Sequence, residues 1–97
     1  MPDQDNARPL AKKEWSPLLQ ELAGWKVLNG KRLRKEWAFE SFLEAIAFID
    51  RVAGLAEEEG HHPDIFLYNY RYVQITLSTH AIDGLSKKDF ILATKID

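Results

Sequence analysis

The chain has 97 residues, of which 45% are hydrophobic and 29% are charged, as in an ordinary globular domain with one modest core. Its 13 basic and 15 acidic residues give a formal net charge of −2, so no excess of cations is available to neutralise a nucleic-acid backbone. The absence of cysteine excludes disulfides, thiolate metal ligands and a cysteine nucleophile.

The chain begins with a polar segment, Met1 to Pro9, which we expect to be a flexible tail ahead of a single domain over residues 10–97. No apolar run approaches the roughly 20 residues of a membrane-spanning helix, and the polar start lacks the apolar stretch of a secretory signal. We therefore expect a cytoplasmic protein that binds neither membranes nor nucleic acid directly.

A short helix is predicted between Leu10 and Ala23. Ser16 followed by Pro17 is typical of an N-cap and a first helical residue, and Gly24 is typical of a helix stop.

A β-hairpin follows, because Asn29-Gly30 is the strongest two-residue signal for a type I′ turn. Its strands are predicted at Trp25 to Leu28 and Lys31 to Phe39. The second strand has only one partly apolar face, so its polar face should be exposed to solvent.

The main core helix is predicted to run from Ser41 to Gly60. Ser41-Phe42-Leu43-Glu44 has the pattern of a capping box, and Gly60 ends the helical pattern. Apolar residues recur between these points at helical spacing: Phe42, Ala45, Ile46, Ile49, Val52, Ala53 and Ala56.

A second hairpin is expected from two segments rich in β-branched and aromatic residues, Ile65 to Tyr70 and Tyr72 to Ser78, with a turn at Asn69 to Arg71. Three apolar residues share one face of the latter strand: Val73, Ile75 and Leu77.

Ser86-Lys87-Lys88-Asp89 forms another capping box, which predicts a third helix with Phe90, Ile91, Ala93 and Ile96 available to pack. The resulting order is α-β-β-α-β-β-α. It fits a two-layer α+β fold, in which three helices cover one face of a four-stranded antiparallel sheet.

The side chains best suited to proton transfer near neutral pH are three histidines, all at predicted ends of elements. His61 and His62 follow the core helix, and His80 follows the fourth strand. They are either functional groups on a rigid scaffold or ordinary surface and capping histidines. Their spacing disfavours a metal site, because adjacent side chains of an extended segment diverge, whereas metal-binding pairs usually sit at i, i+2 or i, i+4.

Acidic and aromatic residues near these histidines have structural as well as functional interpretations. The run from Glu57 to Glu59 would normally form a solvated face, but its place near a helix C-terminus hints that one glutamate pairs with a ligand or an imidazole. Asp89 is first of all a helix cap. Core packing explains most aromatic residues, and Trp25 is the one that we consider as a wall for a flat heteroaromatic ligand.

The spacing of these residues resembles the pterin-4a-carbinolamine dehydratase family, which includes a dimerisation cofactor of a hepatocyte transcription factor. The pattern, with its flanking parts, covers about residues 16–97: Gly24-Trp25, Trp37 to Phe48, Glu57, His61-His62-Pro63, Tyr70, Thr76 to His80, Gly84 to Ser86 and Asp89. Two positions depart from it. Many relatives have an acidic or amide residue in place of Gly60, and animal-type relatives have an arginine in place of Lys88.

The resemblance implies an enzyme that dehydrates 4a-hydroxytetrahydropterin, the carbinolamine of tetrahydrobiopterin type, to quinonoid dihydropterin and water, without a metal or other cofactor. It would act in pterin recycling after an aromatic amino acid hydroxylase. His61 and His80 would be the acid/base pair, and His62 would mainly bind the pterin and share in catalysis. The further substrate-binding residues would be Glu57, Trp25, Ser78, Thr79 and Asp89.

The resemblance also implies a homodimer or homotetramer. The alternative function is a non-catalytic protein-binding module, which stabilises a transcription-factor dimer or assists assembly of a carbon-fixing enzyme. The intact set of three histidines favours the enzyme, because a binding module has no physical need for three protonatable groups around one cleft.

Overall fold

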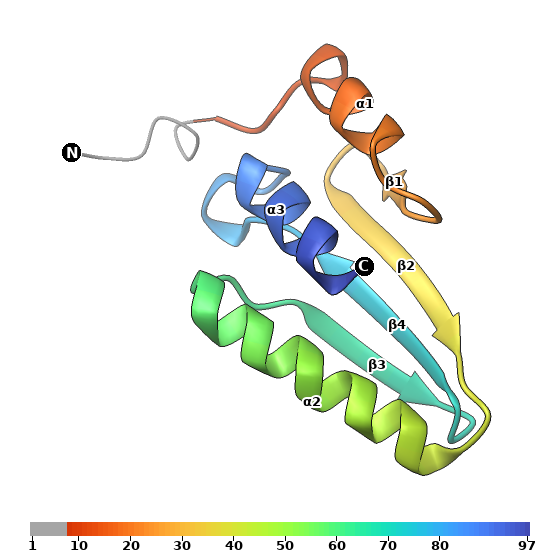
Figure 1. The fold of residues 1–97 in the computed structure, drawn as a ribbon. Coiled ribbons are helices and arrows are strands. Elements are labelled where there is room, and N and C mark those ends of the chain that lie inside the picture. The colour runs from red at the N-terminus through yellow and green to blue at the C-terminus, as the bar shows by residue number, and fades with distance from the viewer. Residues whose placement is uncertain (1–7) are drawn as a thin grey trace.

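The computed structural model of the protein describes residues 8–97. The predicted tail, Met1 to Pro9, lies outside this range apart from Arg8 and Pro9. The elements, in chain order, are α1 (Lys12–Gln20), β1 (Lys26–Leu28), β2 (Arg32–Ala38), α2 (Phe42–Glu59), β3 (Asp64–Tyr68), β4 (Tyr72–Leu77), the short 3-10 helix η2 (His80–Ile82) and α3 (Lys87–Ile96) (Figure 1).

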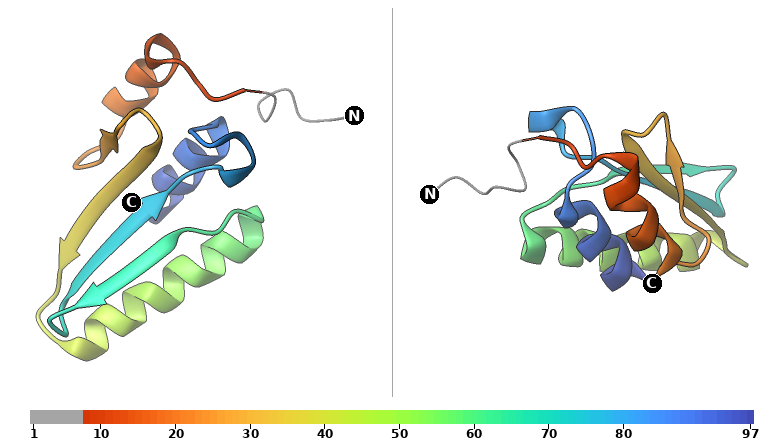
Figure 2. Two further views of the ribbon diagram at one scale, coloured as in Figure 1. Left: turned by 180° about the vertical axis from the view of Figure 1, so that it is seen from behind. Right: turned by 90° about the horizontal axis from the view of Figure 1, so that it is seen from above.

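The four strands form one antiparallel sheet in the order β1-β2-β4-β3, which makes β1 and β3 its edges. All three α-helices lie on the same face of this sheet (Figure 2). The predicted two-layer α+β fold and the predicted order of elements are therefore confirmed.

The core lies between the covered face of the sheet and the helices. Val73, Ile75 and Leu77 are fully buried on one face of β4, as predicted. In α2 the buried face is narrower than predicted, because Phe42 in the first turn is 49% exposed and Ala53 is also exposed. Ala53 lies about 100° around the helix from the buried Val52, which turns it away from the sheet.

The first helix differs from its prediction at both ends. It begins at Lys12, so that Ser16 and Pro17 lie inside it instead of starting it, and it ends at Gln20. Gly24 has the expected positive φ of 82°, but it forms the turn into β1 and does not end the helix.

Contacts with the preceding residues explain why α1 begins early. Ala11, the N-cap residue, has no side-chain acceptor, but its N–H donates to the Glu14 carboxylate at 2.7 Å. Arg8 donates two hydrogen bonds to the same carboxylate, at 2.6 and 2.8 Å. Pro9 packs over Gly84, and the Leu10 N–H donates to the Leu85 carbonyl at 2.8 Å, which anchors the segment before α1 on the loop before α3.

Local sequence signals determine the turn between β1 and β2 and the start of α2. Asn29 and Gly30 both have positive φ, 54° and 71°, as the predicted turn requires, and the Lys31 N–H donates to the Leu28 carbonyl at 2.9 Å. The strands pair from Leu28 and Arg32, so three residues separate them instead of the predicted two. The Ser41 side chain accepts a hydrogen bond from the Glu44 N–H at 3.1 Å. The other half of the predicted capping box is absent among the described residues, because the Glu44 carboxylate accepts from the N–H of Glu40 instead.

The second hairpin turns at Asn69 to Arg71, as predicted, but the strand before it is shorter than the predicted Ile65 to Tyr70 at its C-terminal end. β3 ends at Tyr68, because Asn69 and Tyr70 both adopt positive φ, 47° and 56°. At the other end of the molecule, Gly60 ends α2 with a φ of 63°. This left-handed turn places His61 and His62 between α2 and β3.

Candidate active site

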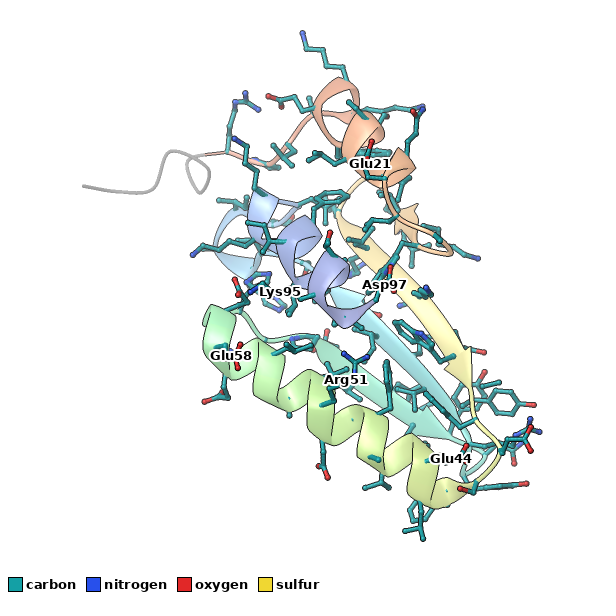
Figure 3. All side chains as sticks on the ribbon, viewed as in Figure 1. Glu21, Glu44, Arg51, Glu58, Lys95 and Asp97 are labelled. Carbon is teal, nitrogen blue, oxygen red and sulfur yellow. The ribbon has the colours of Figure 1, made fainter. Side chains whose placement is uncertain are left out.

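The packing of α3 against α2 positions the polar groups at the helix ends. Arg51 of α2 points toward the C-terminal end of α3, where it donates a hydrogen bond to the Ile96 carbonyl at 2.7 Å (Figure 3). Lys95 of α3 forms an ion pair with Glu59 at 2.7 Å, and this hydrogen bond raises the pKa of Lys95. The two helices are thus joined both at the middle of α2, through Arg51, and at its C-terminal end, through Glu59.

His61 reaches from the end of α2 to the first turn of α3. Its Nε2 atom lies 2.5 Å from Oδ1 of Asp89. The Asp89 side chain is completely buried, and that of His61 is only 11% exposed. The other carboxylate oxygen, Oδ2, accepts hydrogen bonds from the Thr79 hydroxyl and the Ser86 N–H, both at 2.9 Å. Asp89 therefore joins the ends of α2 and β4 to the start of α3.

His62 forms a second pair with a carboxylate, but at the surface. Its Nε2 atom lies 2.6 Å from Oε2 of Glu57, and the two side chains are 63% and 77% exposed. This is one of the two arrangements expected for a glutamate at the end of α2, a contact with an imidazole. Because both groups are in solvent, little free energy is needed to exchange one partner for a ligand.

His80 begins η2 and is exposed. Within residues 8–97 its imidazole has no hydrogen-bond partner. It lines a small polar pocket of about 50 Å³ with five other residues: Lys31, Arg32, Ser78, Asp83 and Gly84. That volume suits one or two water molecules.

An ion pair borders this pocket. Lys31 Nζ lies 2.8 Å from Oδ2 of Asp83, and this hydrogen bond lowers the pKa of Asp83. Ser78 is half-buried beside it. The link from His80 to His61 runs through the chain, since Thr79 precedes His80 and donates to the carboxylate that binds His61.

Trp25 lies in the core in this structure. The residue is 6% exposed, its ring packs edge-to-face on Trp37 at 5.6 Å, and its indole N–H donates to Oδ2 of Asp97 at 3.0 Å. A contact between Trp25 and a flat ligand stays a prediction.

Ser86 is the polar residue of this region to which the sequence assigns only a capping role. The predicted capping box is present, and in addition the Ser86 hydroxyl lies 2.7 Å from the Thr79 hydroxyl. The signal that could have found it is the double use of Asp89, which belongs both to this cap and to the family pattern.

No group of three or more histidine, aspartate and glutamate side chains in residues 8–97 is arranged to hold a metal ion. In the same range, none of the helices has the length and apolar character to cross a membrane.

The model of the family described as pterin 4 alpha carbinolamine dehydratase matches residues 8–97. The chain belongs to this dehydratase family. A putative pterin-4-alpha-carbinolamine dehydratase of Rubrobacter xylanophilus is 41% identical over 97 residues, which cover all of this chain and 90% of the relative. The mitochondrial pterin-4-alpha-carbinolamine dehydratase 2 of Arabidopsis thaliana is 43% identical over 93% of this chain and 50% of the relative.

Two solved structures of dehydratase type share the fold. A transcriptional coactivator/pterin dehydratase from Brucella melitensis has a TM-score of 0.84 and 31% identity, over 92% of this chain and 95% of the other. A pterin dehydratase-like protein, identified as a RuBisCO assembly factor in the alpha-carboxysome, has a TM-score of 0.62 and 32% identity, over 75% of this chain and 84% of the other. The resemblance inferred from the sequence pattern is confirmed.

Proposed function

We propose that the protein is a hydro-lyase that converts 4a-hydroxytetrahydropterin, of the 4a-hydroxytetrahydrobiopterin type, to quinonoid dihydropterin and water. The observation that carries this proposal is the match to the dehydratase family over all described residues, a range that contains all three histidines.

The reaction needs one proton delivered and one removed. The substrate carries a hydroxyl group on a ring carbon next to a ring nitrogen. As the C–O bond breaks, the oxygen gains a proton and leaves as water, while the ring system loses a proton as the new double bond forms. Two positioned imidazoles are enough for both transfers, and no metal is needed.

His61 and His80 are the proposed acid/base pair. The bond to buried Asp89 supports this role for His61, because it holds one imidazole in a fixed orientation. The absence of a hydrogen-bond partner for the His80 imidazole within residues 8–97 leaves both of its ring nitrogens available to a substrate.

His62 chiefly binds and orients the pterin, with Glu57 as its partner. Their exposed pair can open toward a ligand at low cost. Ser78, which lines the small pocket beside His80, is a further proposed contact. Thr79 donates its hydroxyl to Oδ2 of Asp89, and Oδ1 of the same carboxylate binds His61, which supports a role for both residues in holding His61.

The reaction would place the protein after an aromatic amino acid hydroxylase in pterin recycling. A cytoplasmic location agrees with the lack of cysteine, although the plant relative is named as mitochondrial.

A homodimer or homotetramer is the proposed assembly. Strand β3 is an edge strand with exposed apolar side chains at Ile65, Phe66 and Tyr68, and such an edge favours pairing with a second copy. Light scattering at micromolar concentration should give a mass above that of the monomer, and a monomer alone would contradict the assembly.

The test of the enzymatic proposal is a dehydration assay on freshly generated 4a-hydroxytetrahydropterin, before and after exhaustive chelation. We expect dehydration faster than the uncatalysed background and unchanged by chelation. A loss of activity that zinc restores would contradict the metal-free mechanism.

A second candidate function is protein binding, which the names of the two solved structures favour. A partner would contact helix surfaces away from the histidines, so the two functions can coexist. If the chain gives no acceleration of dehydration, the binding function becomes the preferred one.

A further inference from the structure

The donor in each hydrogen bond around Asp89 can be assigned, because each hydroxyl group has only one proton to donate. The Thr79 hydroxyl has one proton, and it donates that proton to Oδ2 of Asp89. The contact of 2.7 Å between the Thr79 and Ser86 hydroxyls is then donated by Ser86. The Ser86 hydroxyl oxygen in turn accepts from the Lys88 N–H at 3.3 Å. In this buried network the Ser86 hydroxyl therefore donates to the Thr79 hydroxyl, and the Thr79 hydroxyl donates to Asp89.

The remaining bond, between His61 and Asp89, can be made in two ways. Either Asp89 is a carboxylate and His61 Nε2–H donates to it, or Asp89 is a neutral acid and donates to a bare Nε2. Two features favour the carboxylate. Oδ2 accepts two hydrogen bonds, from Thr79 and from the Ser86 N–H, and such bonds stabilise the charged form. Asp89 also lies in the first turn of α3, where the helix dipole favours a negative charge.

A carboxylate at Asp89 fixes the tautomer of neutral His61. The proton is on Nε2, and the lone pair is on Nδ1, which has no protein partner within residues 8–97. We propose that Thr79 and Ser86 are positioning residues that act through Asp89 to hold His61 as the Nε2–H tautomer, so that Nδ1 is the nitrogen that exchanges a proton with the substrate. The chemical part of this inference rests on the proposed function, and the tautomer itself does not.

His62 is an internal reference for this inference. It also uses Nε2, but its partner Glu57 is exposed and has no hydrogen bond from another side chain in residues 8–97. Water can replace Glu57, so the tautomer of His62 is free to exchange. The two neighbouring imidazoles should therefore differ in tautomer although their bonds are similar in length.

The first test is spectroscopic. Uniformly ¹⁵N-labelled protein, at a pH where neutral imidazole predominates, should give three histidine ring patterns in a long-range ¹H–¹⁵N correlation spectrum, one for each histidine of the chain. The pattern that disappears in His61→Gln belongs to His61. We expect it to be a pure Nε2–H tautomer, and a pure Nδ1–H tautomer would overturn the proposal whether or not the protein is a dehydratase.

The second test inverts the tautomer. In Asp89→Asn, the side-chain oxygen should stay with its donors, the Thr79 hydroxyl and the Ser86 N–H, so that the amide NH₂ faces His61. Nε2 must then accept a hydrogen bond from this NH₂ group, and His61 should become the Nδ1–H tautomer. We expect kcat to fall by up to about 10⁴-fold, as when an aspartate that orients a catalytic histidine is changed to asparagine. Retention of the Nε2–H tautomer in Asp89→Asn would contradict the inference.

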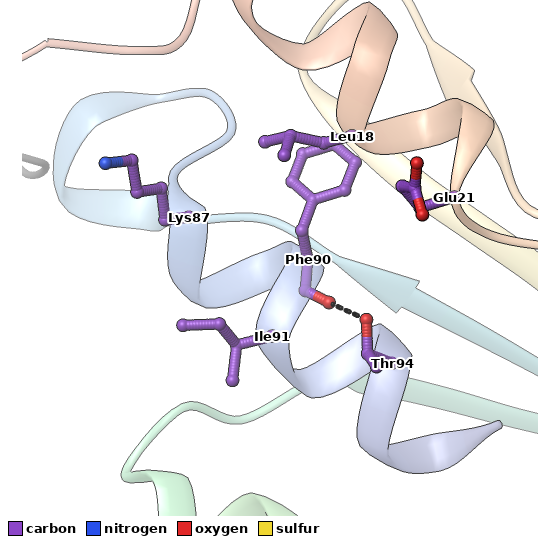
Figure 4. A pocket seen from close by; sticks show the side chains of 6 residues that line it. All are labelled: Leu18, Glu21, Lys87, Phe90, Ile91 and Thr94. Atoms are coloured by element: carbon purple, nitrogen blue, oxygen red, sulfur yellow. Dashed lines mark hydrogen bonds between the residues drawn. The ribbon is translucent and has the colours of Figure 1, made fainter.

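The third test removes the hydroxyl of a positioning residue. Thr79→Val should lower kcat about tenfold with less than about a twofold change in KM, and Thr79→Ser should restore most of the activity. The matched control is Thr94→Val. Thr94 donates its hydroxyl to the Phe90 carbonyl at 2.9 Å, lines an apolar pocket of about 310 Å³ between α1 and α3 (Figure 4), and makes no hydrogen bond to Asp89.

The results separate the inference from the proposed function. Equal activity of Thr79→Val and Thr94→Val would remove Thr79 from the positioning role, even if the wild-type protein is a dehydratase. A wild-type protein without dehydratase activity, but with the Nε2–H tautomer at His61 and the inverted tautomer in Asp89→Asn, would leave the positioning network intact and refute the proposed function.

Discussion

His61 and His62 are neighbours in the chain, and each binds a carboxylate through Nε2, at 2.5 Å to Asp89 and at 2.6 Å to Glu57. The first pair is buried and its carboxylate has two further donors, whereas the second pair is exposed and stands alone among the described residues. Bond length therefore says little about what each pair does. The difference lies in what happens when a partner is removed.

Breaking the buried pair leaves polar groups without water or protein to bind, and this costs free energy. Breaking the exposed pair exchanges one hydrogen bond for another with solvent. A buried pair of this kind holds a group in place, whereas an exposed pair can open for a ligand. Four sets of substitutions can break or sharpen this contrast between buried and exposed polar groups.

The largest effect is expected on catalysis. Changing His61 or His80 to alanine should lower kcat by about 10²- to 10⁴-fold, the usual contribution of a positioned acid or base. His62→Ala should raise KM at least as much as it lowers kcat, because it removes binding that is present in ground and transition states alike. Steady-state kinetics with all three variants make the comparison. Near-normal kcat in all of them would refute histidine catalysis and favour the binding function.

The next effect is on stability. Asp89→Ala should lower the free energy of unfolding by about 3–5 kcal/mol, because it leaves the Thr79 hydroxyl and the Ser86 N–H buried without their acceptor. Glu57→Ala, the matched change in the exposed pair, should cost less than about 0.5 kcal/mol. Urea unfolding followed by circular dichroism measures both. Equal costs would show that the burial of the pair has no energetic consequence.

A smaller difference is expected between the two serine N-caps. Ser41 caps α2 through the Glu44 N–H alone, whereas Ser86 caps α3 and also donates to Thr79. Ser86→Ala should therefore cost about 2 kcal/mol and Ser41→Ala about 1 kcal/mol, within the range known for such caps. The urea midpoints of the two variants test this order, and a larger loss in Ser41→Ala would reverse it.

The smallest effect concerns a third carboxylate, again at the surface. The hydrogen bonds from Arg8, followed by that from the Ala11 N–H, lower the pKa of Glu14 to about 2. A lowered pKa in the folded protein adds stability above the ordinary pKa of 4.5, and this stability is lost as the pH falls toward 2. The small destabilisation by Arg8→Ala should thus be present at pH 7 and disappear near pH 2. A ¹³C titration of Glu14 in the variant should show its pKa moving back toward 4.5, and an unchanged pKa would exclude Arg8 as its main cause.

Local signals predict much of this fold because they act over a few residues. The turn at Asn29-Gly30 and the end of α2 at Gly60 need only residues that tolerate positive φ. The start of α1 was not predictable in this way. It depends on Arg8, outside the expected domain, and on a bond from Leu10 to Leu85 at the far end of the sequence.

The features of the site also divide into those that the sequence pattern predicts and those that depend on tertiary packing. The pattern of the sequence predicts that His61, His62 and Asp89 belong to one functional set. That His61 pairs with Asp89 and His62 with Glu57 could not be derived from spacing, because the first pairing depends on how α3 packs against α2. The role of Ser86 depends on the same packing, since its hydroxyl meets Thr79 only when the loop after β4 folds back on α3.

The contact of Pro9 with Gly84 couples two positions at opposite ends of the chain. A Cβ atom added to Gly84 would lie 2.6 Å from Cβ of Pro9, closer than real side chains approach each other. The identity of residue 84, in the loop that carries His80, is therefore constrained by a residue that precedes the first helix. Among relatives that keep this contact, the two positions should covary: a side chain at position 84 should occur together with a smaller residue, or a displaced segment, at position 9.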